Sequence, residues 1–164
     1  MPDREEDDWV GEQGQRIDEL IDTYRAALHD SLDGLTEEEA RRQLVPSRTT
    51  LLGLVKHARF VEGVWFDQAI TGRSYAEIGI AATVDGSFTL DDADTIASVG
   101  AEFRGCWEIS RANLTGLRSD EVVDGRGQRV VWALRLQVLR EFAQHAGHAD
   151  ILREQILASR RAAN

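Results

Sequence analysis

The chain has 164 residues, and its 29 acidic residues outnumber its 19 basic residues, which gives a formal net charge of −10. A field of this sign repels phosphate, so neither a nucleic acid nor an anionic membrane surface is expected as a partner. No segment is apolar over the length that a bilayer requires, and the acidic start lacks the pattern of a secretory signal. The single cysteine, Cys106, allows no internal disulfide. These features predict a cytoplasmic protein that folds as one domain over 1–164, with a flexible acidic tail at 1–12.

The first part of the chain predicts one long helix and one short helix. Over residues 13–33, apolar side chains recur on one side at helical spacing. Thr36 and Glu39 then have the spacing of a capping box, which indicates a short helix that continues to about Leu44 and ends before Pro46.

A second long helix is predicted over residues 47–70, with Lys56, Arg59 and Glu62 away from the centre of its apolar stripe. Residues 71–91 carry glycines among small, β-branched and polar residues, so they predict a long connection without a helix. A connection of this length is uncommon in a compact domain, and it is long enough to cross the length of a helical bundle.

Two more long helices are predicted in the second half of the chain. The acidic residues at 91–94 favour the positive end of a helix dipole, and apolar residues then recur on one face as far as Leu114. The segment 116–129 predicts a loop, and residues 130–160 predict the longest helix. Four long amphipathic helices, without a repeat or a second domain, predict an all-α four-helix bundle.

Three ligand-type side chains share one face of the last predicted helix. At about 100° of rotation per residue, Glu141, His145 and His148 fall within about 60° of one another. Their arc overlaps the apolar stripe of the helix, so Glu141 and His145 are expected to point into the core. An ionised carboxylate is costly there unless it is paired, neutralised or bound to a metal. The position of Glu141 therefore calls for a partner.

A further ligand-type side chain comes from the second long helix, where His57 lies at the centre of the apolar stripe. Together with Glu141 and His145, it supplies one carboxylate oxygen and two imidazole nitrogens, which leaves coordination positions open for water or substrate. This donor set is typical of a catalytic metal site. The alternative is that each histidine is an ordinary hydrogen-bonded core residue, which is the more frequent role of an isolated inward histidine.

Other residues have more ordinary interpretations. His148 is interpreted as a residue that supports Glu141 or His145, with a fourth metal ligand or a polar residue near the rim as alternatives. His29 lies off the apolar stripe of its helix and is expected at the surface. Cys106 is expected to be a small, inert, buried thiol. Three large aromatic residues at helical spacing are expected to pack in the core or in an interface rather than to bind a cofactor; these are Trp65, Trp107 and Trp132.

Two segments carry a resemblance to a known family: LLGLVKHARFVEGVWF at 51–66 and LREFAQHAGHADILREQI at 139–156. They resemble the DinB/YfiT-like superfamily of metalloenzymes, in particular its actinobacterial branch of unknown function, and the likeness covers residues from about 15 to about 155. The resemblance implies an up-down-down-up bundle whose second and third long helices are joined by a crossover at 71–91. It also implies that His57, Glu141 and His145 bind a divalent metal, often zinc or nickel. Many members have histidine in place of Glu141, whereas the mycothiol-dependent maleylpyruvate isomerase of this superfamily has glutamate.

Relatives in this superfamily include transferases and isomerases that use mycothiol or bacillithiol. The resemblance therefore implies a metal-dependent S-transferase or isomerase that joins a small-molecule electrophile to a low-molecular-weight thiol, with His148 as a candidate proton shuttle. Two alternatives stay open, namely a metal-dependent hydrolase and a non-enzymatic, stress-associated metal-binding protein. Homodimers are frequent among relatives, so a homodimer is a further expectation.

Overall fold

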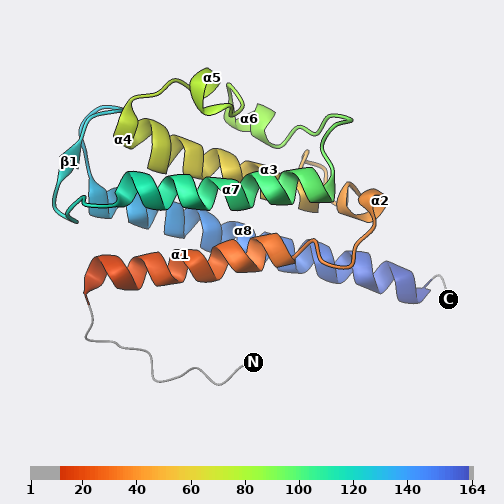
Figure 1. Cartoon of the computed structure of the whole chain (residues 1–164). Coiled ribbons are helices and arrows are strands. Elements are labelled where there is room, and N and C mark those ends of the chain that lie inside the picture. The colour runs from red at the N-terminus through yellow and green to blue at the C-terminus, as the bar shows by residue number, and fades with distance from the viewer. Residues whose placement is uncertain (1–11, 163–164) are drawn as a thin grey trace.

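The structure, a computed structural model, describes residues 12–162, and four long helices make up most of this part of the chain (Figure 1). The long helices are α1 (Gln13–Asp30), α3 (Leu51–Glu62), α7 (Ile96–Leu114) and α8 (Val131–Ala162). The shorter elements are α2 (Glu37–Ala40), the π-helix η1 (Gly63–Gln68), α4 (Ala69–Thr71), α5 (Tyr75–Ile78), α6 (Val84–Ser87) and the strands β1 (Val122–Val123) and β2 (Arg129–Val130). The protein is therefore mostly helical, as its periodicity predicts.

Side-chain caps fix where several helices begin. The Thr36 side chain accepts a hydrogen bond from the Glu39 amide while the Glu39 carboxylate accepts from the Thr36 amide, which confirms the predicted capping box. The short helix that follows ends at Ala40 rather than near Leu44. Residues 1–11 of the expected acidic tail lie outside the described residues. Glu12, which was assigned to that tail, instead caps α1 by accepting from the Gln15 amide.

The long helices lie side by side along most of their length (Figure 1). α1 packs along α8, and α3 packs against both α7 and α8. α1 and α8 run toward one end of the molecule, whereas α3 and α7 run toward the other (Figure 1). Because α3 and α7 are parallel neighbours, the chain has to return between them, and the segment that carries α5 and α6 makes this return.

Two connections contain more structure than the sequence predicts. The connection at 71–91 was expected to hold no helix, but it forms the single turns α5 and α6, which Ser74 and Thr83 cap. The predicted loop at 116–129 contains a small antiparallel hairpin in which Val122 pairs with Val130. Elements this short show no hydrophobic period, because one turn or two residue pairs cannot repeat a pattern. Local caps and contacts with neighbouring helices hold them instead: α5 contacts η1, α6 contacts α3, and β2 contacts α8.

The apolar core gathers side chains from all four long helices. Leu28, Leu54, Phe103 and Phe142 come from α1, α3, α7 and α8 in turn, and each is fully buried. A packed interior of this kind holds the helices rigidly, so side chains that project from them keep fixed relative positions. Within the described residues, no helix combines the length and the apolar character needed to cross a membrane.

Glu62 differs from its predicted position. It was expected to lie away from the apolar stripe, yet it is only 1% exposed. Both of its carboxylate oxygens accept from Arg25 of α1, each at 2.8 Å, and the Ser110 hydroxyl donates a third hydrogen bond. The periodicity of α3 alone cannot reveal this arrangement, because the charge that balances Glu62 comes from a different helix.

The π-helix η1 follows α3 directly and continues it beyond its C-terminal end. Residues of η1 are spaced by wider turns than those of an α-helix, which changes the direction in which the following side chains point. The Asn113 side chain of α7 donates to the Phe66 carbonyl at 2.9 Å, so a backbone acceptor in this stretch has a partner. Trp65 and Gln68 lie within this stretch: Trp65 lines the cavity described below, and Gln68 accepts a hydrogen bond from Arg126, which also lines it.

Candidate metal centre

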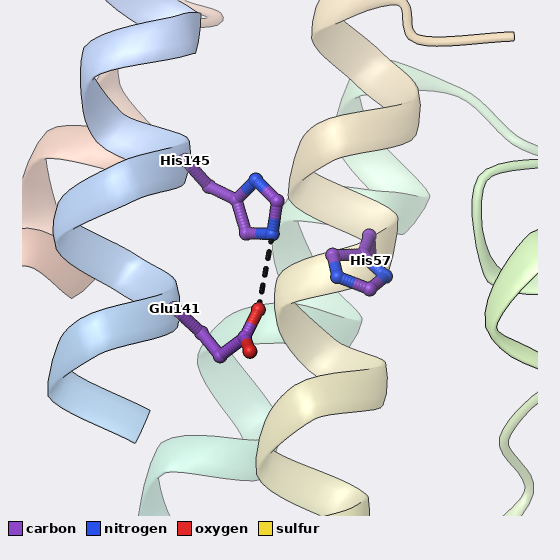
Figure 2. A group of neighbouring side chains, drawn as sticks. All are labelled: His57, Glu141 and His145. Carbon is purple, nitrogen blue, oxygen red and sulfur yellow. Dashed lines mark ion pairs between the residues drawn. The ribbon is translucent and has the colours of Figure 1, made fainter. Parts of the chain in front are cut away.

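The three side chains predicted to form a site come together between α3 and α8. His57 projects from α3, while Glu141 and His145 project from successive turns of α8 toward it (Figure 2). Each offers one ligand atom, and these atoms all lie within 4.8 Å of one another. The i, i+4 spacing of Glu141 and His145 places both on one face of α8, as helix geometry requires. The three side chains therefore form a candidate metal-binding group.

His57 is held in one orientation by residues of the crossover. Its Nδ1 lies 2.7 Å from the Ser87 hydroxyl, whose own proton is donated to the Val84 carbonyl. The hydroxyl oxygen therefore accepts from Nδ1, and Nε2 keeps its lone pair for a ligand. The Phe88 ring stacks on the imidazole, with ring centroids 4.0 Å apart. In a metal-binding histidine, the ring nitrogen that does not bind the metal usually forms a hydrogen bond of this kind, which fixes the orientation of the ring.

Glu141 is oriented by its neighbours on the same helix. Its Oε1 accepts from Gln137 Nε2 at 3.0 Å and from Arg140 Nη2 at 2.6 Å. The other oxygen, Oε2, faces His145 Nε2 at 3.4 Å (Figure 2). One oxygen is thus satisfied within the protein, while the other faces the point where the three side chains meet.

His145 is the least satisfied group in this site. Its side chain is largely buried, and neither Nδ1 nor Nε2 has a hydrogen-bond partner among the described residues. The 3.4 Å contact with Glu141 is an ion-pair distance that does not meet the geometry of a hydrogen bond. Buried polar atoms without partners are rare and call for an explanation, and a bound metal ion supplies one.

Burial keeps the two imidazoles neutral. It lowers the pKa of His57 to about 3, with the neighbouring His145 as a second cause. Burial also lowers the pKa of His145, although the nearby Glu141 carboxylate opposes this change. Neutral imidazole is the form that binds metal ions, so at neutral pH both rings are in that form.

The site opens into a cavity of about 330 Å³. His57, Glu141 and His145 line this cavity together with aromatic side chains and polar groups, which include Gln137 and Arg126. A metal held only to stabilise the fold is normally closed off by four protein ligands. Three ligands beside an open cavity are instead the arrangement of a site that admits a substrate.

His148 and Cys106, which the sequence also singled out, lie outside this cavity. His148 is exposed, its ring centroid lies 5.7 Å from that of His145, and it lines a separate groove with Val45 and Ile151. Its role in proton transfer stays a prediction. Burial raises the pKa of the Cys106 thiol well above its usual value, and Glu62 adds to this effect, which agrees with an inert thiol.

Two other residues that the sequence singled out depart from their expected surroundings. His29 is half-buried rather than at the open surface, because its ring meets the edge of Trp107 at a centroid distance of 6.0 Å. Trp65 packs against the core as expected, but it also lines the cavity. Ser87, Phe88 and Arg126 were not predicted from the sequence, since they lie in connections without a periodic pattern.

The fold and the site together define a helical protein with a candidate three-residue metal centre that is open on one side. The sequence model of one family, described as mycothiol S-transferase, matches residues 16–158. The chain belongs to this family, which is a member of the DinB-like superfamily that the two sequence segments resemble. Searches of curated proteins and of solved structures gave no significant match.

Proposed function

We propose that this protein is a divalent-metal-dependent S-transferase that uses mycothiol or a related low-molecular-weight thiol. The observation that carries the proposal is the convergence of His57, Glu141 and His145, with unused donor atoms, on an open cavity. Membership of the mycothiol S-transferase family supports the choice of thiol and reaction. Zinc and nickel are the metals that we propose for the site, since both accept imidazole and carboxylate ligands.

Each residue of the site has a separate task in this proposal. His57 Nε2, the His145 ring and Glu141 Oε2 hold the metal, while Ser87 and Arg140 keep His57 and Glu141 in position. When bound, the metal lowers the pKa of a coordinated thiol and so provides a thiolate at neutral pH. The aromatic side chains of the cavity exclude water from the reacting sulfur and orient the electrophile beside it.

We also propose that the four long helices form the up-down-down-up bundle expected from the resemblance. Two features support this topology: the opposite directions of the helix pairs α1/α8 and α3/α7, and the crossover between α3 and α7. In this arrangement α3 and α8 are direct neighbours, which allows ligands from both helices to reach a single ion.

Elemental analysis of protein purified without added metal tests the site. We expect about one divalent metal per chain in the wild type and less than about a tenth of that in His57→Ala, Glu141→Ala and His145→Ala. His29→Ala, which removes a histidine that lies outside the cavity, is the matched control and should keep its metal. Unchanged metal content in all three ligand variants would rule out the site.

A second experiment tests the reaction. The zinc-loaded protein is incubated with a fluorogenic bimane electrophile, with and without mycothiol, and the thioether product is measured. We expect product formation above the uncatalysed rate only when the thiol is present and only with the three ligands intact. Release of a hydrolysed product at the same rate without thiol would favour a hydrolase instead, and catalysis of neither reaction would favour a non-enzymatic metal protein.

A further inference from the structure

The rim of the cavity carries an arginine that has no acidic partner within residues 12–162. Arg126 lies in the turn between β1 and β2 and lines the same cavity as the candidate metal centre. Its Nη1 donates to Gln68 Oε1 at 2.6 Å and to the Tyr75 hydroxyl oxygen at 2.9 Å. Both partners are neutral, so neither balances the charge of the guanidinium.

Several other arginines of the described residues form ion pairs. The chain has 29 acidic residues and 19 basic ones, so carboxylates that could pair with an arginine are abundant. Arg73 and Arg135, for example, bind Asp67 and Asp18 at 2.9 and 2.8 Å. Among the residues that the structure describes, the hydrogen bonds of Arg126 all leave from Nη1, so Nη2 and Nε of its planar fork remain for a ligand. A fork of this kind matches the two oxygens of a carboxylate.

The backbone holds Arg126 at the rim of the cavity. The amide of the preceding residue, Gly125, donates to the Ala69 carbonyl at 3.0 Å. A Cβ atom at position 125 would lie 2.1 Å from the Gln68 carbonyl oxygen, so only glycine allows the turn to approach the end of η1 this closely. The guanidinium then lies over Trp65, with its carbon 5.6 Å from the ring centroid. The charge is therefore positioned by the fold rather than carried on a free loop.

We propose that Arg126 binds a carboxylate of the electrophilic substrate, with the apolar body of that substrate packed against the aromatic wall that Trp65, Tyr75 and Phe88 form. The inference rests on the proposed S-transferase function for the statement that this ligand is a substrate. It adds a substrate class, namely a small carboxylate on a planar, apolar body. The net negative charge of the protein repels anions from most of its surface. A positive charge at the cavity therefore favours the binding of an anion at this position.

Calorimetric titration of the full-length, zinc-loaded protein with benzoate and with benzamide tests the binding step. The two probes have nearly the same shape and differ in charge. We expect benzoate to bind at least about tenfold more tightly than benzamide, and Arg126→Gln to reduce this preference to about twofold or less. Arg126→Lys, which keeps the charge but not the fork, should keep part of the preference and guards against a folding defect in the glutamine variant. Arg118→Gln is the matched control, since Arg118 is exposed, pairs with Asp120 and lies outside the cavity.

The same titration of protein treated with EDTA separates Arg126 from the metal as the source of the preference. If Arg126 binds the carboxylate, the preference for benzoate persists without metal and is lost in Arg126→Gln. A preference that disappears with the metal and is unchanged in Arg126→Gln would overturn the inference, as would equal binding of the two probes by the wild type.

A kinetic comparison of two electrophiles, one with a carboxylate and one without, tests whether Arg126 binds the electrophile. Mycothiol is reacted with 4-(chloromethyl)benzoate or with 4-(chloromethyl)benzamide; in each reaction a carbon–sulfur bond forms, chloride leaves with the bonding electrons and the thiol proton passes to the buffer. If Arg126 binds the electrophile, Arg126→Gln raises the KM of the benzoate about tenfold and leaves that of the amide unchanged. Mycothiol has no free carboxylate, because its cysteinyl carboxyl group forms an amide bond, so its KM should stay unchanged with both electrophiles. An unchanged KM of the benzoate would overturn the inference, whereas selective benzoate binding without any S-transfer would overturn only the proposed function.

Discussion

Two polar clusters among the described residues differ in how completely their groups are satisfied. In the first cluster, which we call the Arg25–Glu62 pair, both Glu62 oxygens accept from Arg25 at 2.8 Å and Ser110 donates as well. In the second, the candidate metal centre, both ring nitrogens of His145 lack a hydrogen-bond partner among the described residues. Each cluster takes one residue from α3, namely Glu62 in the first and His57 in the second.

The difference separates a structural role from a binding role. Burial of a charged or polar group does not by itself indicate function, because the Arg25–Glu62 pair is complete without any ligand. The candidate metal centre instead presents donor atoms to a cavity, and the His145 nitrogens have no hydrogen-bond partner among the described residues. The Arg25–Glu62 pair is therefore expected to govern stability, and the candidate metal centre is expected to govern binding.

Removal of Glu62 should have the largest effect on stability. Glu62→Ala leaves the guanidinium of Arg25 buried without its partner, and we expect a loss of about 3–5 kcal/mol in the free energy of unfolding. Glu141→Ala in metal-free protein should cost about 1 kcal/mol or less, because Glu141 is only partly buried and its partner Arg140 is exposed. Urea denaturation of both variants measures the difference. Equal losses would remove the distinction between the two clusters.

Zinc should stabilise the protein through the candidate metal centre alone. At a free zinc concentration about 100 times the dissociation constant, binding adds about 2.7 kcal/mol to the free energy of unfolding. For a chain of this size, such a gain raises the thermal midpoint by about 5–10 °C. EDTA should reverse the shift, and His145→Ala should abolish it. A shift of the same size in His145→Ala would show that zinc binds elsewhere.

The pH dependence of stability should report the buried imidazole of His57. Its pKa is about 3 in the folded protein against an ordinary value of 6.5, so between these values the unfolded chain binds a proton that the folded chain does not. Stability of the metal-free protein should therefore fall as pH decreases through this window, by up to about 1.4 kcal/mol per pH unit for this one group. His57→Gln should show a shallower decrease, while His29→Gln serves as the control for loss of a histidine. Equal slopes for the wild type and His57→Gln would contradict the assignment.

The smallest effect is expected for Cys106. Its buried thiol has a raised pKa and donates to the Phe103 carbonyl, so it is a poor nucleophile. Cys106→Ala should keep metal content and thiol-dependent turnover within about twofold of the wild type. Iodoacetamide should label the native protein slowly and the urea-unfolded protein fast. Loss of turnover in Cys106→Ala would mean that the protein supplies its own sulfur and would contradict the use of an external thiol.

Much of this architecture is already evident in the sequence. The long helices follow from apolar periodicity, which needs only enough residues to repeat, and the start of α2 follows from the spacing of Thr36 and Glu39. The positions of His57, Glu141 and His145 on apolar stripes also predict that the three would meet. That inference succeeds because each residue lies on a long, regular helix whose inward face is defined by its own neighbours.

Other features depend on contacts between distant parts of the chain. The burial of Glu62 requires Arg25, which lies on another helix, and the placement of Arg126 requires the contact of Gly125 with the end of η1. The π-helical stretch shifts the direction of Trp65, which the α-helical period does not predict. Local sequence patterns carry no signal for such relations, so these parts of the site became evident only in the structure.

The crossover between α3 and α7 does more than connect two parallel helices. It contributes Tyr75, Val84 and Phe88 to the cavity, and Ser87 to the orientation of His57, whereas Glu141 and His145 come from α8. In the proposed function, the part of the substrate-binding wall that Tyr75, Val84 and Phe88 form is thus encoded in a different stretch of the gene from the helices that carry the metal donors. Changes at positions such as Tyr75 or Val84 can alter which molecules are accepted while the helical scaffold stays the same, so specificity and stability are free to evolve separately.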